Sequence, residues 1–230
     1  IMMGESLFTS RITLSALGEE DFGIYNIVGG IVVLFSFLNS ALTTATQRFL
    51  NYEIGKENEK AVNQIFCMSM NIYIGLSIII IVLSETIGLW FLNTQMNIPE
   101  NRMQAAYWVY QFSILSFIIN LIRVPYNATI IAYEKMSFFA YLSMIEVMFK
   151  LISVYYLYIT SSDKLIIIAI LYTIIPFLIN IVYKKYCNTH FTTSQFHLFW
   201  NKILFKKLTS FSIWNFFGSL ANIGATQGIN

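Results

Sequence analysis

The chain has 230 residues, of which 57% are hydrophobic and 11% are charged, and its mean hydropathy is +0.63. A soluble protein of this length needs a charged surface, so this composition predicts a membrane protein. The net charge of +2 is too small to indicate a nucleic-acid partner, and no basic run with interleaved aromatic residues occurs. Cys67 and Cys187 are isolated in the sequence, which predicts neither a metal site nor a structural disulfide.

Successive apolar stretches predict an all-α fold, a polytopic membrane helix bundle. The predicted spans are residues 1–17 (a partial span), 24–46, 65–92, 105–132, 138–159 and 165–183. Together with a connector at 184–207 they make a first bundle over residues 1–207, and residues 208–230 begin a second bundle. Because both ends of the chain fall inside apolar stretches, we expect an amino-terminal portion of a longer protein.

The charged residues concentrate in the connectors between these spans. Residues 17–23 carry two glycines and three acids, and residues 48–64 are predicted to form a short solvated helix. In the 184–207 connector an apolar face recurs, made of Phe196, Phe199, Trp200, Ile203 and Leu204. This pattern predicts an amphipathic helix on the membrane surface.

Basic residues predict the orientation of the spans. The connectors 48–64, 132–137 and 184–207 hold Arg48, Lys56, Lys60, Lys135, Lys184, Lys185, Lys202, Lys206 and Lys207, whereas the other side holds Arg11, Arg102 and Lys164. Since cytoplasmic loops carry the excess of lysine and arginine, the first three connectors are predicted to be cytoplasmic.

Polar side chains follow one face of several predicted helices. In the 105–132 span they are Ser113, Ser116, Asn120, Arg123 and Asn127, and in the 138–159 span they are Ser143, Glu146, Lys150 and Ser153. Steps of three and four keep residues on one helical face. Serine and asparagine alone would equally suit hydrogen bonds between helices. With three charges on these faces we favour a polar lumen.

The charged residues of the two spans allow two pairings. In an antiparallel hairpin, Arg123 and Glu146 would lie at nearly equal depth, about 12–14 Å from the joining turn at about 1.5 Å per residue. Alternatively, Glu146 and Lys150 would neutralise each other at i, i+4, which would leave Arg123 for a ligand. Pro125 is predicted to kink the helix near Arg123 and to act as a hinge.

These residues together predict a carrier for an anionic or amphiphilic substrate. The predicted substrate-binding residues are Arg123, Arg48, Arg11, Asn120, Asn127, Asn39, Gln47 and Lys150. Glu146 is the predicted ion-coupling carboxylate, with H⁺ or Na⁺ as the ion. Arg48 could instead anchor a helix at the membrane boundary, and Arg11 could instead extend to the surface from a helix end.

A catalytic function finds little support in the sequence. His190 and His197 lie in the basic connector, where solvated loop residues are the simplest interpretation. No phosphate-binding glycine loop, metal-spaced cluster or nucleophile with a suitably spaced base occurs, so neither an enzyme nor a cofactor or metal site is expected.

Three runs carry a resemblance to a known family: LGEEDFGIYNIVGG at 17–30, LNSALTTATQRFL at 38–50 and VPYNATIIAYEKM at 124–136. In these runs the chain resembles the polysaccharide-biosynthesis flippases that export O-antigen and capsule repeat units, within the multidrug/oligosaccharidyl-lipid/polysaccharide exporter superfamily. The resemblance implies the first half of a two-bundle transporter in a bacterial cytoplasmic (inner) membrane. The substrate it implies is an oligosaccharide linked to an undecaprenyl-diphosphate-type lipid, flipped between leaflets by alternating access.

Three other functions stay open. A multidrug antiporter of the same superfamily should have a cavity richer in acids. A flippase for a peptidoglycan precursor differs only in its substrate. A membrane-embedded glycan polymerase or ligase should carry large polar loops on the outer side, where this sequence has only short ones, at 18–23, 93–104 and 161–164.

Overall fold

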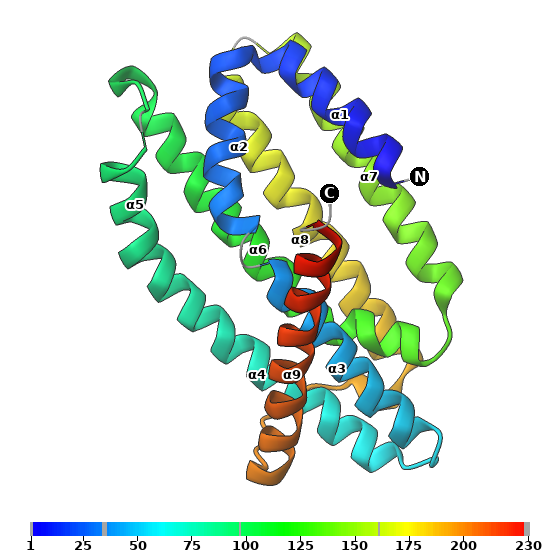
Figure 1. Cartoon of the computed structure of the whole chain (residues 1–230). Coiled ribbons are helices and arrows are strands. Elements are labelled where there is room, and N and C mark those ends of the chain that lie inside the picture. Colours follow the sequence, from blue (N-terminus) through cyan, green and yellow to red (C-terminus); the bar gives the residue numbers. More distant parts are fainter. Residues whose placement is uncertain (1, 34–35, 97, 161, 228–230) are drawn as a thin grey trace. The chain divides into compact units, whose positions relative to one another are not determined.

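The protein is described by a computed structural model covering residues 2–33, 36–96, 98–160 and 162–227, and within these ranges the regular structure is entirely helical (Figure 1). In chain order the helices are α1 (Met2–Leu17), α2 (Glu19–Val33), α3 (Ser36–Ile54), α4 (Glu59–Leu83), a π-helical turn (Ser84–Gly88), α5 (Leu89–Thr94), a 3₁₀ turn (Glu100–Arg102), α6 (Met103–Ala132), α7 (Met136–Ile159), α8 (Lys164–His190), a 3₁₀ turn (Thr192–Ser194) and α9 (Lys202–Gln227). The predicted all-α fold class is confirmed.

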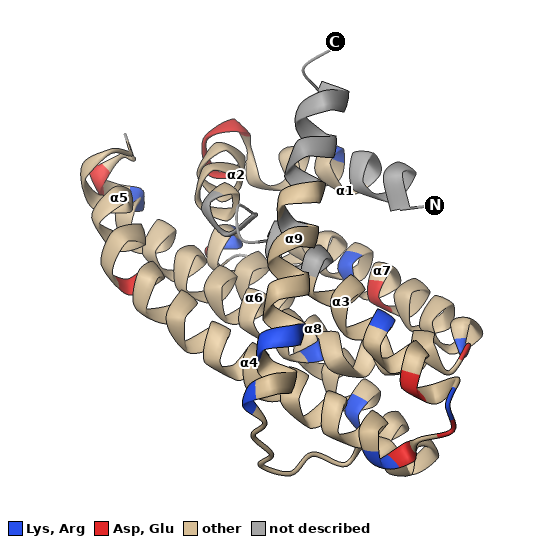
Figure 2. Ribbon diagram, turned by 60° about the horizontal axis from the view of Figure 1, so that its bottom comes forward, with Lys and Arg blue, Asp and Glu red and all other residues tan. Residues whose placement is uncertain are grey.

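Within the described ranges, four helical segments are long and apolar enough to cross a membrane: Glu59–Thr94, Glu100–Ala132, Met136–Ile159 and Lys164–His190. A helix satisfies its own backbone hydrogen bonds, which is why apolar chains of this kind cross bilayers as helices. Figure 2 shows the uncharged middle of α4 and the charged residues at the α3–α4 turn. The fold is that of a multi-pass membrane protein.

The chain forms two compact units, and four long helices contribute residues to both. Unit 1 comprises Ile1–Leu34, Ile80–Ile119 and Ala140–Ile179, and unit 2 comprises Phe35–Ile79, Asn120–Phe139 and Asn180–Asn230. The division falls inside α4, α6, α7 and α8.

Unit 1 begins with α1 and α2, which contact each other and are joined at Gly18 (Figure 1). Gly18 has a φ of +85°, a conformation that costs glycine little because it has no Cβ. Its N–H donates to the Leu14 carbonyl at 2.9 Å, which ends α1. The three acids that follow are the first turn of α2, where carboxylates interact favourably with the helix dipole.

The core of unit 1 contains a close approach between a glycine and a tyrosine. The buried apolar residues around it are Ile24, Val28, Leu92, Ala105, Ala106, Val109, Tyr110, Ile114, Leu165 and Ala169. Tyr110 is fully buried, and its hydroxyl donates to the Ser84 carbonyl at 2.9 Å, in the π-helical turn. A Cβ on Gly88 would lie 1.7 Å from the Tyr110 hydroxyl oxygen. Only glycine leaves this space open.

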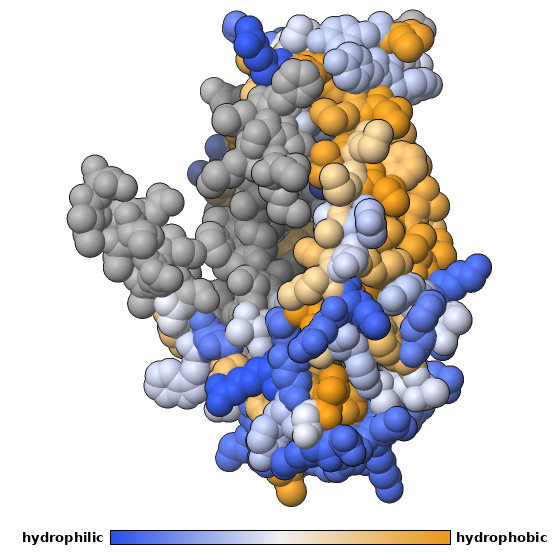
Figure 3. All heavy atoms as spheres, turned by 90° about the vertical axis from the view of Figure 1, so that its right-hand side faces the viewer, coloured by the Kyte–Doolittle hydropathy of each residue, from blue (hydrophilic) through white to orange (hydrophobic). Residues whose placement is uncertain are grey.

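One face of α7 in unit 1 is apolar and exposed. Its exposed large residues are Tyr141, Met144, Ile145, Met148, Phe149, Ile152, Tyr155, Tyr156, Tyr158 and Ile159. Figure 3 shows a large hydrophobic area at the upper right of the face that it draws, with hydrophilic residues above and below it. An exposed apolar face of this extent is expected for a helix that contacts lipid.

Unit 2 is organised around α3 and α9, which lie side by side (Figure 1). The Phe211 ring of α9 is 5.8 Å from the Phe49 ring of α3, in an edge-to-face arrangement. A second contact buries Leu50 of α3 against Val62 and Ile65 of α4 and Ala128 of α6. Aromatic and aliphatic contacts therefore hold this unit together.

Several predicted boundaries differ from the observed ones. The predicted span 24–46 is covered by α2 and α3, and residues 34–35 between them lie outside the described part. The predicted solvated helix at 48–64 is instead the end of α3, a turn at residues 55–58 and the start of α4. Its sharp turn is marked by Glu57, whose φ is +57°.

The predicted amphipathic helix in the 184–207 connector is wrong. Helix α8 continues to His190, residues 195–201 form no helix, and α9 begins at Lys202. The side chain of Asn201 caps α9, because its Oδ1 accepts from the backbone N–H groups of Ile203 (2.9 Å) and Leu204 (3.1 Å). The division of the chain into two bundles at residue 207 stays a prediction.

Candidate functional site

The predicted polar face of α6 falls mostly in unit 2. Asn120, Arg123 and Asn127 follow steps of three and four on this helix, and all three are partly buried. They therefore share one face of α6, as predicted. Partial burial of a guanidinium within a helix that could cross a membrane is costly unless it has partners.

One partner of Arg123 is an aromatic ring. The guanidinium carbon of Arg123 lies 5.6 Å from the centre of the Tyr183 ring of α8, within unit 2. A cation over a ring face is attracted by the negative charge of that face. Because this attraction engages only one face of the planar guanidinium, it is compatible with N–H groups that bind an anion at the edge.

Two features lie close to Arg123 on α6. The Oδ1 atom of Asn127 is buried, and no hydrogen-bond donor reaches it from the described residues. Pro125 is buried within the continuous helix Met103–Ala132, and the hydroxyl of Thr129 donates to its carbonyl at 2.9 Å. Proline lacks an N–H, so the Leu121 carbonyl loses its usual helical donor. The hinge function of Pro125 stays a prediction.

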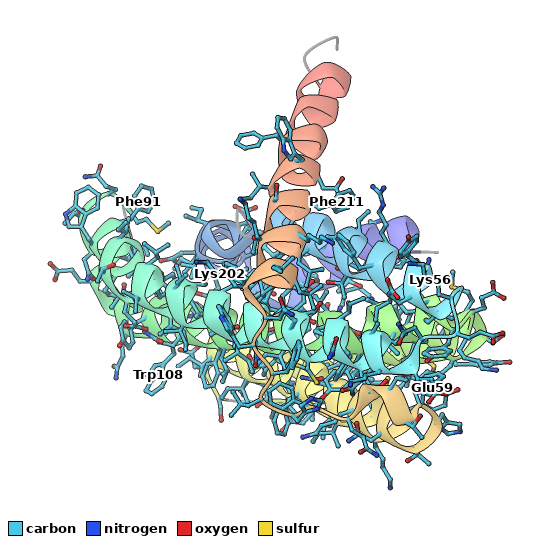
Figure 4. The ribbon with its side chains drawn as sticks, turned by 90° about the horizontal axis from the view of Figure 1, so that it is seen from below. Lys56, Glu59, Phe91, Trp108, Lys202 and Phe211 are labelled. Atoms are coloured by element: carbon cyan, nitrogen blue, oxygen red, sulfur yellow. The ribbon has the colours of Figure 1, made fainter. Side chains whose placement is uncertain are left out.

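Arg48 is exposed near the end of α3. Its guanidinium carbon lies 4.5 Å from the centre of the ring of Phe211, a residue of α9 that is labelled in Figure 4. The neighbouring Gln47 is partly buried. The contact with Phe211 gives Arg48 a structural partner at the α3–α9 contact. This geometry suits the boundary anchor that the sequence left open as well as it suits substrate binding.

The predicted coupling carboxylate lies in unit 1. Glu146 Oε1 is 3.1 Å from Lys150 Nζ, one helical turn along α7, and the side chain of Glu146 is 17% exposed. This is the i, i+4 pair that was one of the two predicted pairings. Arg123 and Glu146 belong to different units, and their pairing stays a prediction.

The remaining predicted site residues are placed as follows. Arg11 is exposed on α1 in unit 1. Asn39 belongs to α3 in unit 2, but its side chain lies outside the described part. The predicted substrate-binding residues are therefore divided between the units, with Arg11 and Lys150 in unit 1 and the other six in unit 2.

A group of ion pairs in unit 1, here called the clasp, was not predicted from the sequence. Arg102 Nη1 lies 2.8 Å from Asp163 Oδ2, and Arg102 Nη2 pairs with Asp21. Asp163 also caps α8, since its Oδ1 accepts from the Leu165 N–H at 3.1 Å. The clasp joins α2, the 3₁₀ turn before α6 and the start of α8. Its members come from three predicted connectors, at 17–23, 93–104 and 161–164. Predicting the clasp would have required the further assumption that these connectors contact one another.

A second group, in unit 2, was not predicted from the sequence either. In this group Asn63, Cys67 and Asn71 of α4 hold residues 191–201, here called the strap. Cys67 Sγ lies 3.4 Å from His197 Nδ1. The signal was the spacing of four between Asn63, Cys67 and Asn71, which places them on one face. Their partners are backbone atoms about 130 residues away, which no local pattern indicates.

The polar groups of these helices can bind polar or charged molecules. Among the described residues, no group of three or more His, Cys, Asp or Glu side chains is placed to hold a metal ion. The partly buried polar groups gather on helices that could cross a membrane, at α6 in unit 2 and α7 in unit 1. Polar and charged groups inside membrane spans are commonly found along substrate or ion paths.

Comparison with known proteins agrees with this interpretation. The family model described as MatE matches residues 3–157, which is more than half of the 230-residue chain. The match includes every predicted site residue and ends before the strap. No curated protein and no solved structure matches the chain. The chain belongs to the MatE family, whose members are membrane transporters of the multidrug/oligosaccharidyl-lipid/polysaccharide exporter superfamily rather than enzymes.

Proposed function

We propose that this transporter flips a lipid-diphosphate-linked oligosaccharide, an O-antigen or capsule repeat unit on an undecaprenyl-diphosphate-type lipid, across a bacterial inner membrane. The observation that carries the proposal is the α6 face of unit 2. A partly buried guanidinium lies there between two amides, Asn120 and Asn127, and against the Tyr183 ring. A substrate that combines a diphosphate with sugar hydroxyls would use both kinds of group.

The chemistry of Arg123 favours the diphosphate. Guanidinium N–H groups bind phosphate oxygens in a bidentate manner, and such charge-assisted hydrogen bonds are about twice as strong as neutral ones. They are stronger still where water is excluded. The amide groups of Asn120 and Asn127 can hydrogen-bond sugar hydroxyls. The Asn127 Oδ1 atom, which accepts no hydrogen bond from the described residues, is available for one.

A multidrug antiporter is the second candidate, and one observation favours it. Glu146 is a largely buried carboxylate on a helix that could cross a membrane, and such a group can hold a cationic drug. Lys150 already neutralises that carboxylate, so a cationic drug would have to compete with it. A peptidoglycan-precursor flippase would use the same phosphate chemistry as the proposed substrate.

In the proposed cycle Glu146 couples transport to H⁺ or Na⁺, which requires its pair with Lys150 to separate in one state. The variant Glu146→Gln is neutral in every state. We expect its substrate transport to lose the acceleration that an imposed ion gradient gives the native protein. A variant that responds to the gradient as the native protein does would remove the coupling function from Glu146.

The substrate is tested in cells that lack the full-length gene and carry the native protein, Arg123→Gln, Arg123→Lys or Lys56→Gln at matched membrane abundance. Lipid-diphosphate-linked oligosaccharide and surface polysaccharide are quantified together. Lys56→Gln removes the same charge at the exposed α3–α4 turn and serves as the control. Lysine keeps the positive charge of Arg123 but cannot form the bidentate hydrogen bonds of its planar guanidinium.

We expect the deletion and Arg123→Gln to accumulate the lipid-linked unit and to lose surface glycan, with a partial effect for Arg123→Lys and none for Lys56→Gln. Unchanged pools in the deletion would contradict the proposed substrate class, and drug efflux would then be the leading function. Accumulation of peptidoglycan precursor alone would identify the third candidate. Full rescue by Arg123→Gln would keep the function and exclude Arg123 from the site.

A further inference from the structure

The strap, residues 191–201, joins α8 to α9 and has no function in the proposal above. After a short 3₁₀ turn at Thr192–Ser194, residues 195–201 form no helix or strand. A segment of this kind is usually mobile unless its backbone polar groups find partners. Here the partners come from α4 of the same unit.

Three side chains on one face of α4 hold the strap along its length. Asn63 Nδ2 donates to the carbonyls of Thr193 (2.9 Å) and Gln195 (3.0 Å), Cys67 Sγ donates to the Gln195 carbonyl (3.5 Å), and Asn71 Nδ2 donates to the Phe199 carbonyl (2.7 Å). The backbone N–H of His197 in turn donates to Cys67 Sγ at 3.4 Å. The strap is thereby fixed to α4 at several points over seven residues.

Docking on α4 leaves three large apolar side chains of the strap exposed. They are Phe196 (44% exposed), Leu198 (90%) and Trp200 (66%), each two residues from the next. The spacing of two is that of one face of an extended chain. The backbone groups that bond α4 belong to the alternate residues Thr193, Gln195, His197 and Phe199. Three exposed apolar side chains on one side of a short segment indicate an interaction surface.

The start of α9 adds positive charge next to these apolar residues. Lys202, Lys206 and Lys207 are all exposed in the first two turns, and Ile203 between them is 71% exposed. The ring of Trp200 packs against Phe205 of α9, with 5.0 Å between ring centres. The strap and the first turns of α9 therefore form a continuous surface that combines apolar side chains with lysines.

The position of the strap along α4 indicates what covers this surface. Asn71, which holds the end of the strap, is followed by Ile74, Ile78 and Ile79, which are 37%, 58% and 56% exposed. These isoleucines begin the lipid-facing part of α4. The strap thus lies beside the part of α4 that precedes its apolar stretch, where the headgroup region of a bilayer is expected.

We propose that the strap and the start of α9 form a binding surface for an anionic bilayer surface, and that docking on α4 gives this surface its shape. Phe196, Leu198 and Trp200 insert among the headgroups, and Lys202, Lys206 and Lys207 contact acidic phospholipid. Tryptophan favours the interface because its ring is apolar and its N–H is polar. The proposal does not depend on the transported substrate.

Native Cys67 reports on this state, because its side chain is fully buried and its thiol is held by the docked strap. The full-length protein, with Cys67 as its only cysteine, is placed in nanodiscs of neutral phosphatidylcholine or with added phosphatidylglycerol. The rate of Cys67 labelling by N-ethylmaleimide is measured in both. A second version keeps only the buried Cys187, so that general unfolding is detected separately.

If anionic lipid binds the docked strap, it must stabilise docking and slow the labelling of Cys67. We expect at least about a fivefold reduction, because one lysine near an acidic membrane surface contributes about that factor. The variant Lys202→Gln/Lys206→Gln/Lys207→Gln should lose this lipid dependence. The matched control Lys56→Gln/Lys184→Gln/Lys185→Gln removes three exposed charges elsewhere in unit 2 and should retain it.

Asn63→Ala/Asn71→Ala should raise Cys67 labelling about tenfold in both lipids, as expected for three lost hydrogen bonds of modest net strength. Labelling of Cys187 should not change. Equal labelling of native Cys67 in the two lipids would overturn the proposal. It would also be overturned if the control triple variant lost as much lipid dependence as the variant of Lys202, Lys206 and Lys207. Protection of Cys67 by a soluble protein, without lipid dependence, would overturn it in favour of a protein partner.

Discussion

The two units hold their connecting segments with different chemistry. Unit 1 uses charge, because the clasp of Arg102 with Asp21 and Asp163 joins three helix ends. Unit 2 uses neutral groups, because two asparagines and a cysteine of α4 donate to carbonyls of the strap. Ion pairs depend on exact partners and on salt, whereas amide hydrogen bonds do not respond to ionic strength. The comparison therefore predicts that one contact of the clasp stabilises the protein more than one hydrogen bond of the strap. It also predicts that the clasp is the more sensitive of the two to salt.

The same contrast extends to packing. Unit 1 places the fully buried Tyr110 where only glycine fits, at Gly88, so its core tolerates no added atom there. Unit 2 holds the strap on α4 through hydrogen bonds of Asn63, Cys67 and Asn71, and most side chains of the strap itself are exposed. A transporter that changes conformation can combine a tightly packed contact, such as Gly88 with Tyr110, and a hydrogen-bonded surface segment, such as the strap.

The largest expected effect is that of Gly88→Ala in unit 1. The new methyl group would lie 1.7 Å from the Tyr110 hydroxyl oxygen and 2.9 Å from its ring carbon, so the buried ring must move. We expect a loss of about 3 kcal/mol in unfolding free energy, measured by thermal unfolding in detergent. Adding Tyr110→Phe removes the closest atom and should restore part of the loss. Additive effects in this double-mutant cycle would contradict the steric explanation.

Arg102→Gln should rank second, because it leaves the Asp21 and Asp163 carboxylates without their cation. The Asp21 side chain is only 10% exposed, and its Oδ1 accepts no hydrogen bond from the described residues. We expect a destabilisation of about 2 kcal/mol, measured in the same way. Asp163→Asn should cost less, because that side chain is 32% exposed. A larger effect for Asp163→Asn would show that its cap on α8, rather than the clasp, is the important contact.

Asn71→Ala in unit 2 should cost about 1 kcal/mol, because the Phe199 carbonyl loses a donor at 2.7 Å but can be reached by water. The measurement is the thermal unfolding midpoint relative to the native protein. Asn93→Ala, on the exposed end of α5, is a matched control for asparagine removal. An effect equal to that of Arg102→Gln would contradict the difference between the units.

The smallest expected effect is that of salt on the native protein. Raising ionic strength from about 0.1 to about 1 M shortens the screening length from about 10 to about 3 Å, which weakens the partly exposed clasp. We expect a loss of less than about 1 kcal/mol in unfolding free energy, absent in Arg102→Gln. The Asn71→Ala variant should keep the full salt effect. Loss of the salt effect in Asn71→Ala would mean that the two fastenings are coupled.

Much of the fold could be predicted from the sequence where the physical reason is local. The predicted spans 105–132 and 138–159 lie within two residues of α6 and α7 at every boundary. Apolar length and the requirement for internal backbone hydrogen bonds determine these helices. The Glu146–Lys150 pair could be predicted for the same reason, because a spacing of four places the two side chains on one helical face.

The errors arose where distant residues compete with a local pattern. Phe196, Phe199, Trp200, Ile203 and Leu204 have helical spacing, yet residues 196–201 are not helical. Asn71 of α4 donates to the Phe199 carbonyl within that segment, and Asn63 donates to the Gln195 carbonyl just before it, so a non-helical backbone costs little there. Asn201 then starts α9 one residue later, at Lys202.

The sequence by itself determined that this is an all-α membrane protein with its polar groups on helical faces, because apolar chains have few other ways to satisfy their backbone in a bilayer. Tertiary structure alone decided which polar groups far apart in the sequence meet. Arg102 reaches two acids, 61 and 81 residues away, and Cys67 meets His197 across 130 residues. Pairings at such separations depend on how helices pack, and helix packing is not encoded in the spacing of residues along any one helix.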